Sequence, residues 1–252
     1  DILDAKKISE AMVGCDVVFH LAARSVVYGP ADPNIFIEQN VLGTESVLSA
    51  MHIAGVKKIV FTSSQAIYGN QTGLASEESL AQPISYYGAS KFSAEAVIRA
   101  YCHATNMQTW ILRLANITGN GQTHGVVSDF IKKLKENKNS LQILGDGTQR
   151  KSYLLASECC DAILFALENA NEKINLFNVG SEETIAVKQI AEIVTEEMKL
   201  RPEFILEAKK EGWPGDQTQI TLDTKKINAL GWHNRYSQEE TIKIATRQIT
   251  SG

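Results

Sequence analysis

The chain of 252 residues lacks the features that mark several large functional classes. Its four cysteines form no CxxC pair, and no pair of histidines lies near them, so a metal site is not expected. No apolar run approaches the roughly 20 residues that a membrane helix needs, and a signal peptide is not expected. The 25 basic and 29 acidic residues are spread along the sequence, which argues against a groove for nucleic acid.

The remaining composition is that of an ordinary folded protein. Hydrophobic residues make up 44% and charged residues 21%, which excludes a disordered or fibrous chain. The length suits one large domain, or one domain with a smaller lobe. The cysteines are interpreted as reduced core residues, so a cytoplasmic protein is expected.

Strand and helix patterns alternate through the first half of the chain. Strands are expected at 17–22, 57–61 and 110–114, with helices at 34–55 and 84–106 between them. This alternation predicts an α/β fold with a parallel sheet covered by helices. The polar segment from Thr62 to Pro83 is expected to form a long functional loop. The second half is expected to form a smaller mixed lobe, with strands near 141–144, 153–155 and 177–179 and helices near 128–137, 157–169, 187–199 and 238–249.

Tyr87 and Lys91 are the first candidates for chemistry. A spacing of four places both side chains on one face of a helix. A cation close to a phenol stabilises the phenolate and lowers the pKa of the tyrosine, which would let Tyr87 move a proton near neutral pH. The alternative is that both residues belong to a solvated helix face.

Polar residues also stand where two of the expected strands end. Ser64 follows the strand at 57–61, and Asn116 follows the strand at 110–114. Ligands bind outside the carboxyl ends of strands in open parallel sheets. The hydroxyl of Ser64 could therefore hold a substrate oxygen that Tyr87 protonates, or it could simply cap a turn.

The order of these residues, with several further motifs, resembles the extended short-chain dehydrogenase/reductases, in particular their NAD-dependent epimerase/dehydratase branch. The resemblance runs nearly end to end, and it implies a Rossmann-type doubly wound parallel sheet with a smaller mixed α/β substrate lobe. The matching segments are DILD (1–4), GCDVVFHLAA (14–23), NVLGT (40–44), TSS with IYG (62–64 and 67–69), YGASK (87–91), LR (112–113), GDG (145–147) and WPGD (213–216).

The resemblance implies a role for each matching position. Ser64, Tyr87 and Lys91 would be catalytic, with Tyr87 as acid/base and Lys91 holding the nicotinamide ribose of NAD. The other expected cofactor-binding residues are Asp1, Ile2, Ala22, Ala23, Arg24 and Asn40. The expected substrate-binding residues, beside Ser64, are Asn116, Val126, Val127, Lys151 and Asp216.

The family's glycine-rich turn after its first strand is absent from this chain. We therefore expect the chain to be N-terminally incomplete by about 50–60 residues, or two βαβ units that share a strand. The strand at 17–22 would then pair with a missing strand. Residues 1–120 are expected to form the NAD-binding domain, and residues 121–252 mainly the nucleotide-sugar-binding lobe, interleaved with it.

Positions that would contact the substrate diphosphate also depart from the family. Relatives commonly carry Arg near the positions of Lys151 and Trp213. A lysine supplies a point charge but no bidentate fork. Arg150, Lys209 and Lys210 are alternative phosphate contacts, unless they are solvated surface charges.

The two residues after Ser64 bear on the reaction. Related 4,6-dehydratases carry an Asp-Glu pair there, whereas this chain has Gln65 and Ala66. The segment instead resembles the 4-epimerases that interconvert UDP-glucose and UDP-galactose through a 4-keto sugar with NAD as cofactor. Alternatives are a decarboxylase or ketoreductase of the same family, or a non-catalytic NAD-binding scaffold. The resemblance further implies a homodimer, with helices 34–55 and 84–106 as candidate contacts.

Overall fold

The computed structural model describes residues 1–25, 32–71, 73–209, 212, 217 and 220–251. The chain divides into two compact units, each assembled from three stretches. Unit 1 contains residues 1–69, 77–114 and 163–178, and unit 2 contains residues 70–76, 115–162 and 179–252.

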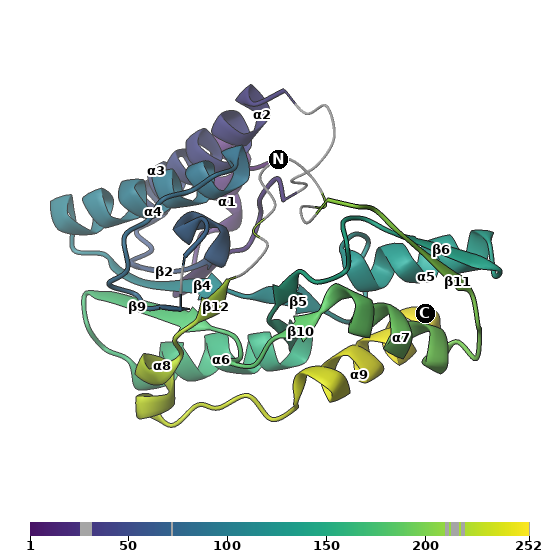
Figure 1. Cartoon of the computed structure of the whole chain (residues 1–252). Helices are drawn as coiled ribbons and strands as arrows, with labels where there is room; N and C mark the ends of the chain where they lie inside the picture. The colour runs from purple at the N-terminus through teal and green to yellow at the C-terminus, as the bar shows by residue number, and fades with distance from the viewer. Residues whose placement is uncertain (26–31, 72, 210–211, 213–216, 218–219, 252) are drawn as a thin grey trace. The chain divides into compact units, whose positions relative to one another are not determined.

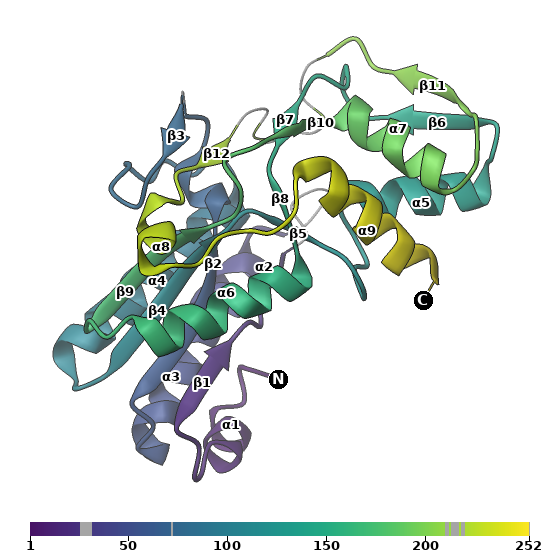
Figure 2. The same ribbon diagram turned by 90° about the horizontal axis from the view of Figure 1, so that it is seen from below.

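Unit 1 is built on a four-stranded sheet with the order β1 (Val17–His20), β2 (Lys58–Ser64), β4 (Gln108–Leu114) and β9 (Ile174–Val179). The neighbours β1 and β2 run parallel, and so do β2 and β4. The predicted parallel sheet is therefore confirmed. Figure 2 shows β1 beside β2 at one end of this strand order.

Helices α1 (Ala5–Ala11), α3 (Gly43–Ala54) and α4 (Tyr86–Ala104) cover one face of this sheet (Figure 1). The expected helix at 34–55 is present as α2 (Asn34–Phe36), a π-helical turn η1 (Ile37–Leu42) and α3. It ends at Gly55, whose φ of 77° favours glycine. The expected helix at 84–106 is α4, which is capped by Ser85, whose Oγ accepts the N–H of Gly88.

The segment 62–83 is more ordered than the predicted loop. Strand β2 continues to Ser64, and a 3-10 turn, η2 (Gln65–Tyr68), follows at once. Turn η2 packs against the first turn of α4, because a Cβ at Gly88 would lie 2.4 Å from the carbonyl oxygen of Ala66. A glycine is needed at this position for the two backbones to approach so closely.

Unit 2 has its own apolar core, formed by helices α5, α7 and α9 against a short sheet. Strands β6 and β11 pair in parallel, as Figure 2 shows. The expected helices near 128–137, 187–199 and 238–249 are present, whereas sequence analysis missed β11. The bounds are α5 (Val126–Glu136), β6 (Ser140–Ile143), α7 (Val187–Glu197), β11 (Glu203–Leu206) and α9 (Gln238–Ser251).

Short strand pairs complete unit 2. Strand β5 (Asn116–Thr118) pairs with β8 (Tyr153–Leu155), and β7 (Arg150–Lys151) pairs with β10 (Ile185–Ala186). Strand β3 (Leu74–Ala75) pairs with β12 (Thr221–Leu222). Helix α8 (Lys225–Leu230) also belongs to unit 2, whereas α6 (Ala156–Asn169) is divided, with residues 156–162 in unit 2 and residues 163–169 in unit 1.

The cysteines are only partly core residues. Cys102 and Cys159 are buried, but Cys15 and Cys160 are exposed, contrary to the sequence interpretation. Within the described ranges, no helix is both long enough and apolar enough to cross a membrane, and no group of three or more potential ligands is placed to hold a metal ion.

Candidate active site

The structure brings Ser64 and Tyr87 together in unit 1. Ser64 ends β2 and caps η2, because its Oγ accepts the N–H of Ala66 at 3.2 Å. The same side chain lies close enough to the side chain of Tyr87, the second residue of α4, to act on its pKa. The hydroxyl thus caps the turn and also lies beside the candidate acid/base. The capping interpretation of Ser64 is confirmed, and its contact with a substrate oxygen stays a prediction.

The pKa of Tyr87 is raised from its ordinary value by burial, while the side chain of Ser64 acts in the lowering direction. Sequence analysis predicted a pKa lowered by Lys91. The prediction is wrong for the ligand-free protein, because desolvation disfavours the charged phenolate and dominates the shift. Without ligand, Tyr87 therefore rests as a neutral phenol that can donate a proton.

Lys91 lies one helical turn after Tyr87 and is only 2% exposed. Its Nζ stands 4.1 Å from the centroid of the Phe61 ring on β2. Burial lowers the pKa of Lys91 to about 8, and attraction to Glu95 opposes this. The ammonium is thus still mostly protonated at neutral pH. A buried cation of this kind is suited to bind a hydroxyl or an anionic oxygen of a ligand.

His20 on β1 forms part of the surroundings of Lys91, which sequence analysis did not foresee. The hydroxyl of Thr44 donates to the carbonyl oxygen of Asn40 at 2.6 Å and contacts Nε2 of His20 at 2.9 Å. Because a threonine hydroxyl has one proton, Nε2 must donate in this contact. Burial, together with the charge of Lys91, lowers the pKa of His20 to about 4, so the ring is neutral. The sequence signal that could have indicated this role is the position of a histidine within an apolar strand.

Asn40 ties the loop after β1 to α4. Its Oδ1 accepts the backbone N–H of Arg24 at 2.7 Å, and its Nδ2 donates to the carbonyl oxygen of Arg24 and to Oγ of Ser90. Asn40 lies in the π-helical turn η1 and is buried. Single π-turns within α-helices frequently occur at functional sites. The segment Ala22–Arg24 is thereby held at the carboxyl end of β1.

The loop after β1 also offers a donor for an anion. Nε of Arg24 is buried and has no hydrogen-bond partner within the described structure. A buried donor of this kind is costly unless a partner binds to it. The phosphates of a dinucleotide are suited to this donor. Of the other expected cofactor-binding residues, Asp1 is exposed, and Ile2 packs against Gly43 at the start of α3.

Of the expected substrate-binding residues other than Ser64, the four that the structure describes fall in unit 2. Asn116 on β5 donates from Nδ2 to the carbonyl oxygen of Ser152 at 3.0 Å, and Lys151 is half-buried on β7. Val127 is fully buried in the apolar core, so the half-buried Val126 is the more accessible of the pair.

Two expected substrate contacts, one to the sugar and one to the phosphates, lie in the segment 210–219, where the structure describes only residues 212 and 217. Asp216 and Lys210 both lie outside the described residues. Arg150 is engaged within unit 2, since it donates to the side chain and the carbonyl oxygen of Thr184. Lys209 pairs with Glu207.

Comparison with known proteins shows which family has this sequence. The sequence model described as "NAD dependent epimerase/dehydratase family" matches residues 1–180. The chain belongs to this family. A protein of Methanocaldococcus jannaschii that is assigned as a UDP-glucose 4-epimerase is 33% identical over 235 residues, which cover 90% of this chain and 75% of that protein. A dTDP-D-glucose 4,6-dehydratase of Mus musculus is 30% identical, with 90% of this chain and 66% of that protein covered.

Solved structures agree with the family. A crystal structure of UDP-galactose 4-epimerase has a TM-score of 0.90 at 33% identity and covers 100% of this chain and 82% of its own. The UDP-glucuronic acid 4-epimerase from Bacillus cereus, in complex with UDP-glucuronic acid and NAD, has a TM-score of 0.90 at 26% identity, covering 100% and 80%. The fold is therefore the Rossmann-type α/β fold of this family, whose cofactor is NAD. The relatives include both epimerases and dehydratases of nucleotide sugars.

Proposed function

We propose that the protein is a nucleotide-sugar 4-epimerase that interconverts UDP-glucose and UDP-galactose or a close relative. The observation that carries the proposal is the identity of the residues after Ser64. Elimination of water across C5 and C6 of a sugar needs a base for one proton and an acid for the leaving hydroxyl. Gln65 and Ala66 supply neither, while the Ser64, Tyr87 and Lys91 side chains needed for chemistry at C4 are all present.

In this mechanism Tyr87 must first lose its own proton, and as the phenolate it removes the proton of the 4-hydroxyl and later returns it, while Ser64 holds the 4-oxygen. NAD, when bound, would supply reversible hydride chemistry at C4 and would not be consumed. Lys91 holds the nicotinamide ribose, and its charge stabilises the phenolate form of Tyr87. Arg24 and Asn40 would hold the cofactor phosphates and the loop beside them. Asp1, Ile2, Ala22 and Ala23 are the further proposed cofactor contacts.

Unit 2 would anchor the nucleotide, so that only the sugar ring turns over between the two hydride transfers. Asn116 and Lys151 are the proposed contacts to the diphosphate. Val126 is the proposed contact to the nucleoside, since the side chain of Val127 is buried in the core of unit 2. Asp216 is the proposed contact near the sugar. Holding one end of a substrate while the other end reacts is a large source of rate, because orientation is fixed before the chemical step.

The test is NMR of UDP-galactose incubated with the complete protein and a catalytic trace of NAD. We expect UDP-glucose to form without net consumption of NAD. The Tyr87→Phe variant is expected to lose activity at least about 100-fold, since it removes the proton-transfer group. The matched control is Tyr86→Phe, because the neighbouring ring is 63% exposed. Full activity of Tyr87→Phe would refute the assigned acid/base.

UDP-glucuronic acid is the second substrate to test, because one of the neighbouring structures is an epimerase in complex with it. Release of CO₂ from this substrate would instead identify a decarboxylase, and stoichiometric use of reduced cofactor a ketoreductase. The 4-epimerase proposal requires neither.

We also propose a homodimer that associates through α3 and α4. Ile53 on α3 is 73% exposed and Phe92 on α4 is 40% exposed. Burial of such apolar side chains favours association. Sedimentation equilibrium of the complete protein decides between monomer and dimer.

A further inference from the structure

Arg113 is a buried charge within an apolar strand of unit 1. It lies on β4 between Leu112 and Leu114 and is 4% exposed. Its Nη2 donates to Oε2 of Glu95 at 2.8 Å, and its Nε contacts Oε1 and Oε2 at 3.1 and 3.3 Å. Glu95 is itself 1% exposed on α4. The guanidinium therefore binds the Glu95 carboxylate of this helix through two of its nitrogen atoms.

The other side of the same guanidinium holds η2. Nη1 of Arg113 donates to Oη of Tyr68 at 2.9 Å and to the carbonyl oxygen of Glu77 at 3.1 Å. The hydroxyl of Tyr68 in turn donates to Oδ1 of Asn178 on β9 at 2.7 Å. Because its donors are fixed in one plane, Arg113 sets the distance and the angle between its partners.

The two elements joined by Arg113 are those that carry the candidate reacting groups. On α4, Glu95 lies one turn after Lys91 and two turns after Tyr87, on the same face. On the other side, η2 begins directly after Ser64. The contacts of Arg113 thus join the same two elements that approach each other closely at Ala66 in η2 and Gly88 in α4, next to Ser64 and Tyr87.

We propose that Arg113, Glu95 and Tyr68 are positioning residues, which hold Ser64 within hydrogen-bonding distance of Tyr87. The part of the proposal that concerns turnover rests on the proposed function. Proteins in which an apolar pair of similar volume replaces a buried ion pair are often as stable or more stable. We therefore expect the charges of Arg113 and Glu95 to contribute mainly to the geometry of the elements that they join. A hydrogen-bonded network whose members are satisfied specifies one arrangement of its elements.

The first variant is Tyr68→Phe, which keeps the ring and both charges but removes the hydroxyl that joins Arg113 to η2. We expect kcat to fall about 10- to 100-fold, as for a small displacement of reacting groups. The KM for the nucleotide sugar should stay within about twofold, because KM rises when the substrate is bound more weakly in the ground state, and Tyr68 is not expected to contact the substrate. Unchanged kcat would overturn the proposal.

A second readout needs no turnover. In protein labelled with ¹³C at the phenolic carbon of tyrosine, the Tyr87 signal is assigned by its loss in Tyr87→Phe. Ser64→Ala shows how the signal moves when the hydrogen bond is lost. The Tyr68→Phe variant should shift the signal in the same direction. An unshifted signal would show that the contact between Ser64 and Tyr87 does not depend on the network of Arg113, Glu95 and Tyr68.

A double variant guards against the case in which Tyr68→Phe fails to fold. Arg113→Met with Glu95→Leu removes one charge of each sign and keeps the core apolar. We expect a melting temperature close to that of the wild type but the same loss of kcat and the same shift of the Tyr87 signal. If the double variant has both the kcat and the melting temperature of the wild type, the network is merely structural and the proposal is overturned.

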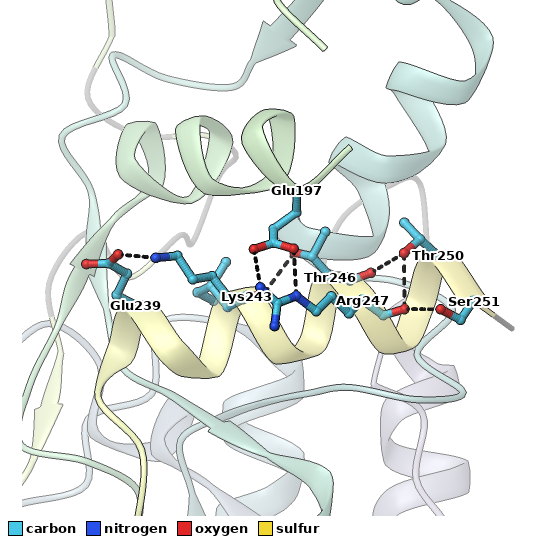
Figure 3. A network of polar contacts seen from close by, with 8 residues as sticks. Glu197, Glu239, Lys243, Thr246, Arg247, Thr250 and Ser251 are labelled. Carbon is cyan, nitrogen blue, oxygen red and sulfur yellow. Dashed lines mark hydrogen bonds and ion pairs between the residues drawn. The ribbon is translucent and has the colours of Figure 1, made fainter. Parts of the chain in front are cut away.

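The matched control is the Arg247–Glu197 pair of unit 2, which joins α9 to α7 (Figure 3). It is also a two-point contact, at 2.7 and 2.8 Å. Arg247→Met with Glu197→Leu should leave kcat and the Tyr87 signal unchanged. If the wild type turns over no nucleotide sugar, the proposed function fails. The Tyr87 signal still tests whether the network of Arg113, Glu95 and Tyr68 positions Ser64.

Discussion

Replacing Lys91 with methionine should make the cofactor-free protein more stable at neutral pH while it destroys activity. Burial lowers the pKa of Lys91 from 10.5 to about 8. Each pKa unit corresponds to about 1.36 kcal/mol, so carrying the charge costs the folded state about 3 kcal/mol. Attraction of the ammonium to the Phe61 ring offsets about 1–2 kcal/mol of this. The expected gain for Lys91→Met at pH 7 is therefore about 1–2 kcal/mol.

The sign of the pH dependence follows from the lowered pKa. Between pH 8 and pH 10.5 the unfolded chain binds more protons at Lys91 than the folded chain does. The stability contributed by this group must therefore rise with pH across that window. Lys91→Met removes this rise, so the difference between variant and wild type should be largest below pH 8 and vanish above pH 10.5.

Urea unfolding of the NAD-free protein at pH 7 and pH 10 measures both effects. Lys132→Met, at an exposed position of α5, is the matched control and should change neither. The reasoning is refuted if Lys91→Met is no more stable than the wild type at pH 7, or if its advantage does not shrink as the pH rises. In the presence of NAD and substrate, kcat should fall at least about 100-fold, since the cation beside the phenolate is lost.

Two further substitutions test the packing that supports the site. Gly88→Ala forces a Cβ to within 2.4 Å of the Ala66 carbonyl, so we expect a loss of about 1–3 kcal/mol in urea unfolding and a fall in kcat; wild-type behaviour would mean that η2 and α4 can separate freely. Leu134→Ala removes a fully buried side chain from the core of unit 2 and should cost about 2–5 kcal/mol with little change in the Tyr87 signal; a loss below about 1 kcal/mol would contradict this packing.

Elements with a strong apolar period could be predicted from the sequence. The helix around 84–106 and the strands near 58–64 and 108–114 have enough buried side chains for their pattern to show. Strands of two residues, such as β3 and β12, have no period to detect, and they are set by pairing between distant segments. The π-turn at Asn40 is likewise a tertiary feature, stabilised by contacts with Arg24 and Ser90.

The candidate site shows the same division. Tyr87 and Lys91 are linked by helical spacing, so their shared face could be predicted. The pairing of Arg113 with Glu95 links a strand to a helix and has no local pattern. Its signal was the arginine inside an otherwise apolar strand, because a buried guanidinium requires a buried partner. The pKa of Tyr87 depended on burial, which spacing alone does not report.

The interleaving of the two units limits how such a protein can be altered. Each unit is assembled from three separate stretches of chain, so no single crossover between two related genes can exchange one whole unit and leave the other intact. A chimera that exchanges one unit for that of a relative would need several junctions, each inside a folded element or close to one. Recombination is thus a poor route to a new substrate preference in this architecture, and stepwise point substitution is the accessible one.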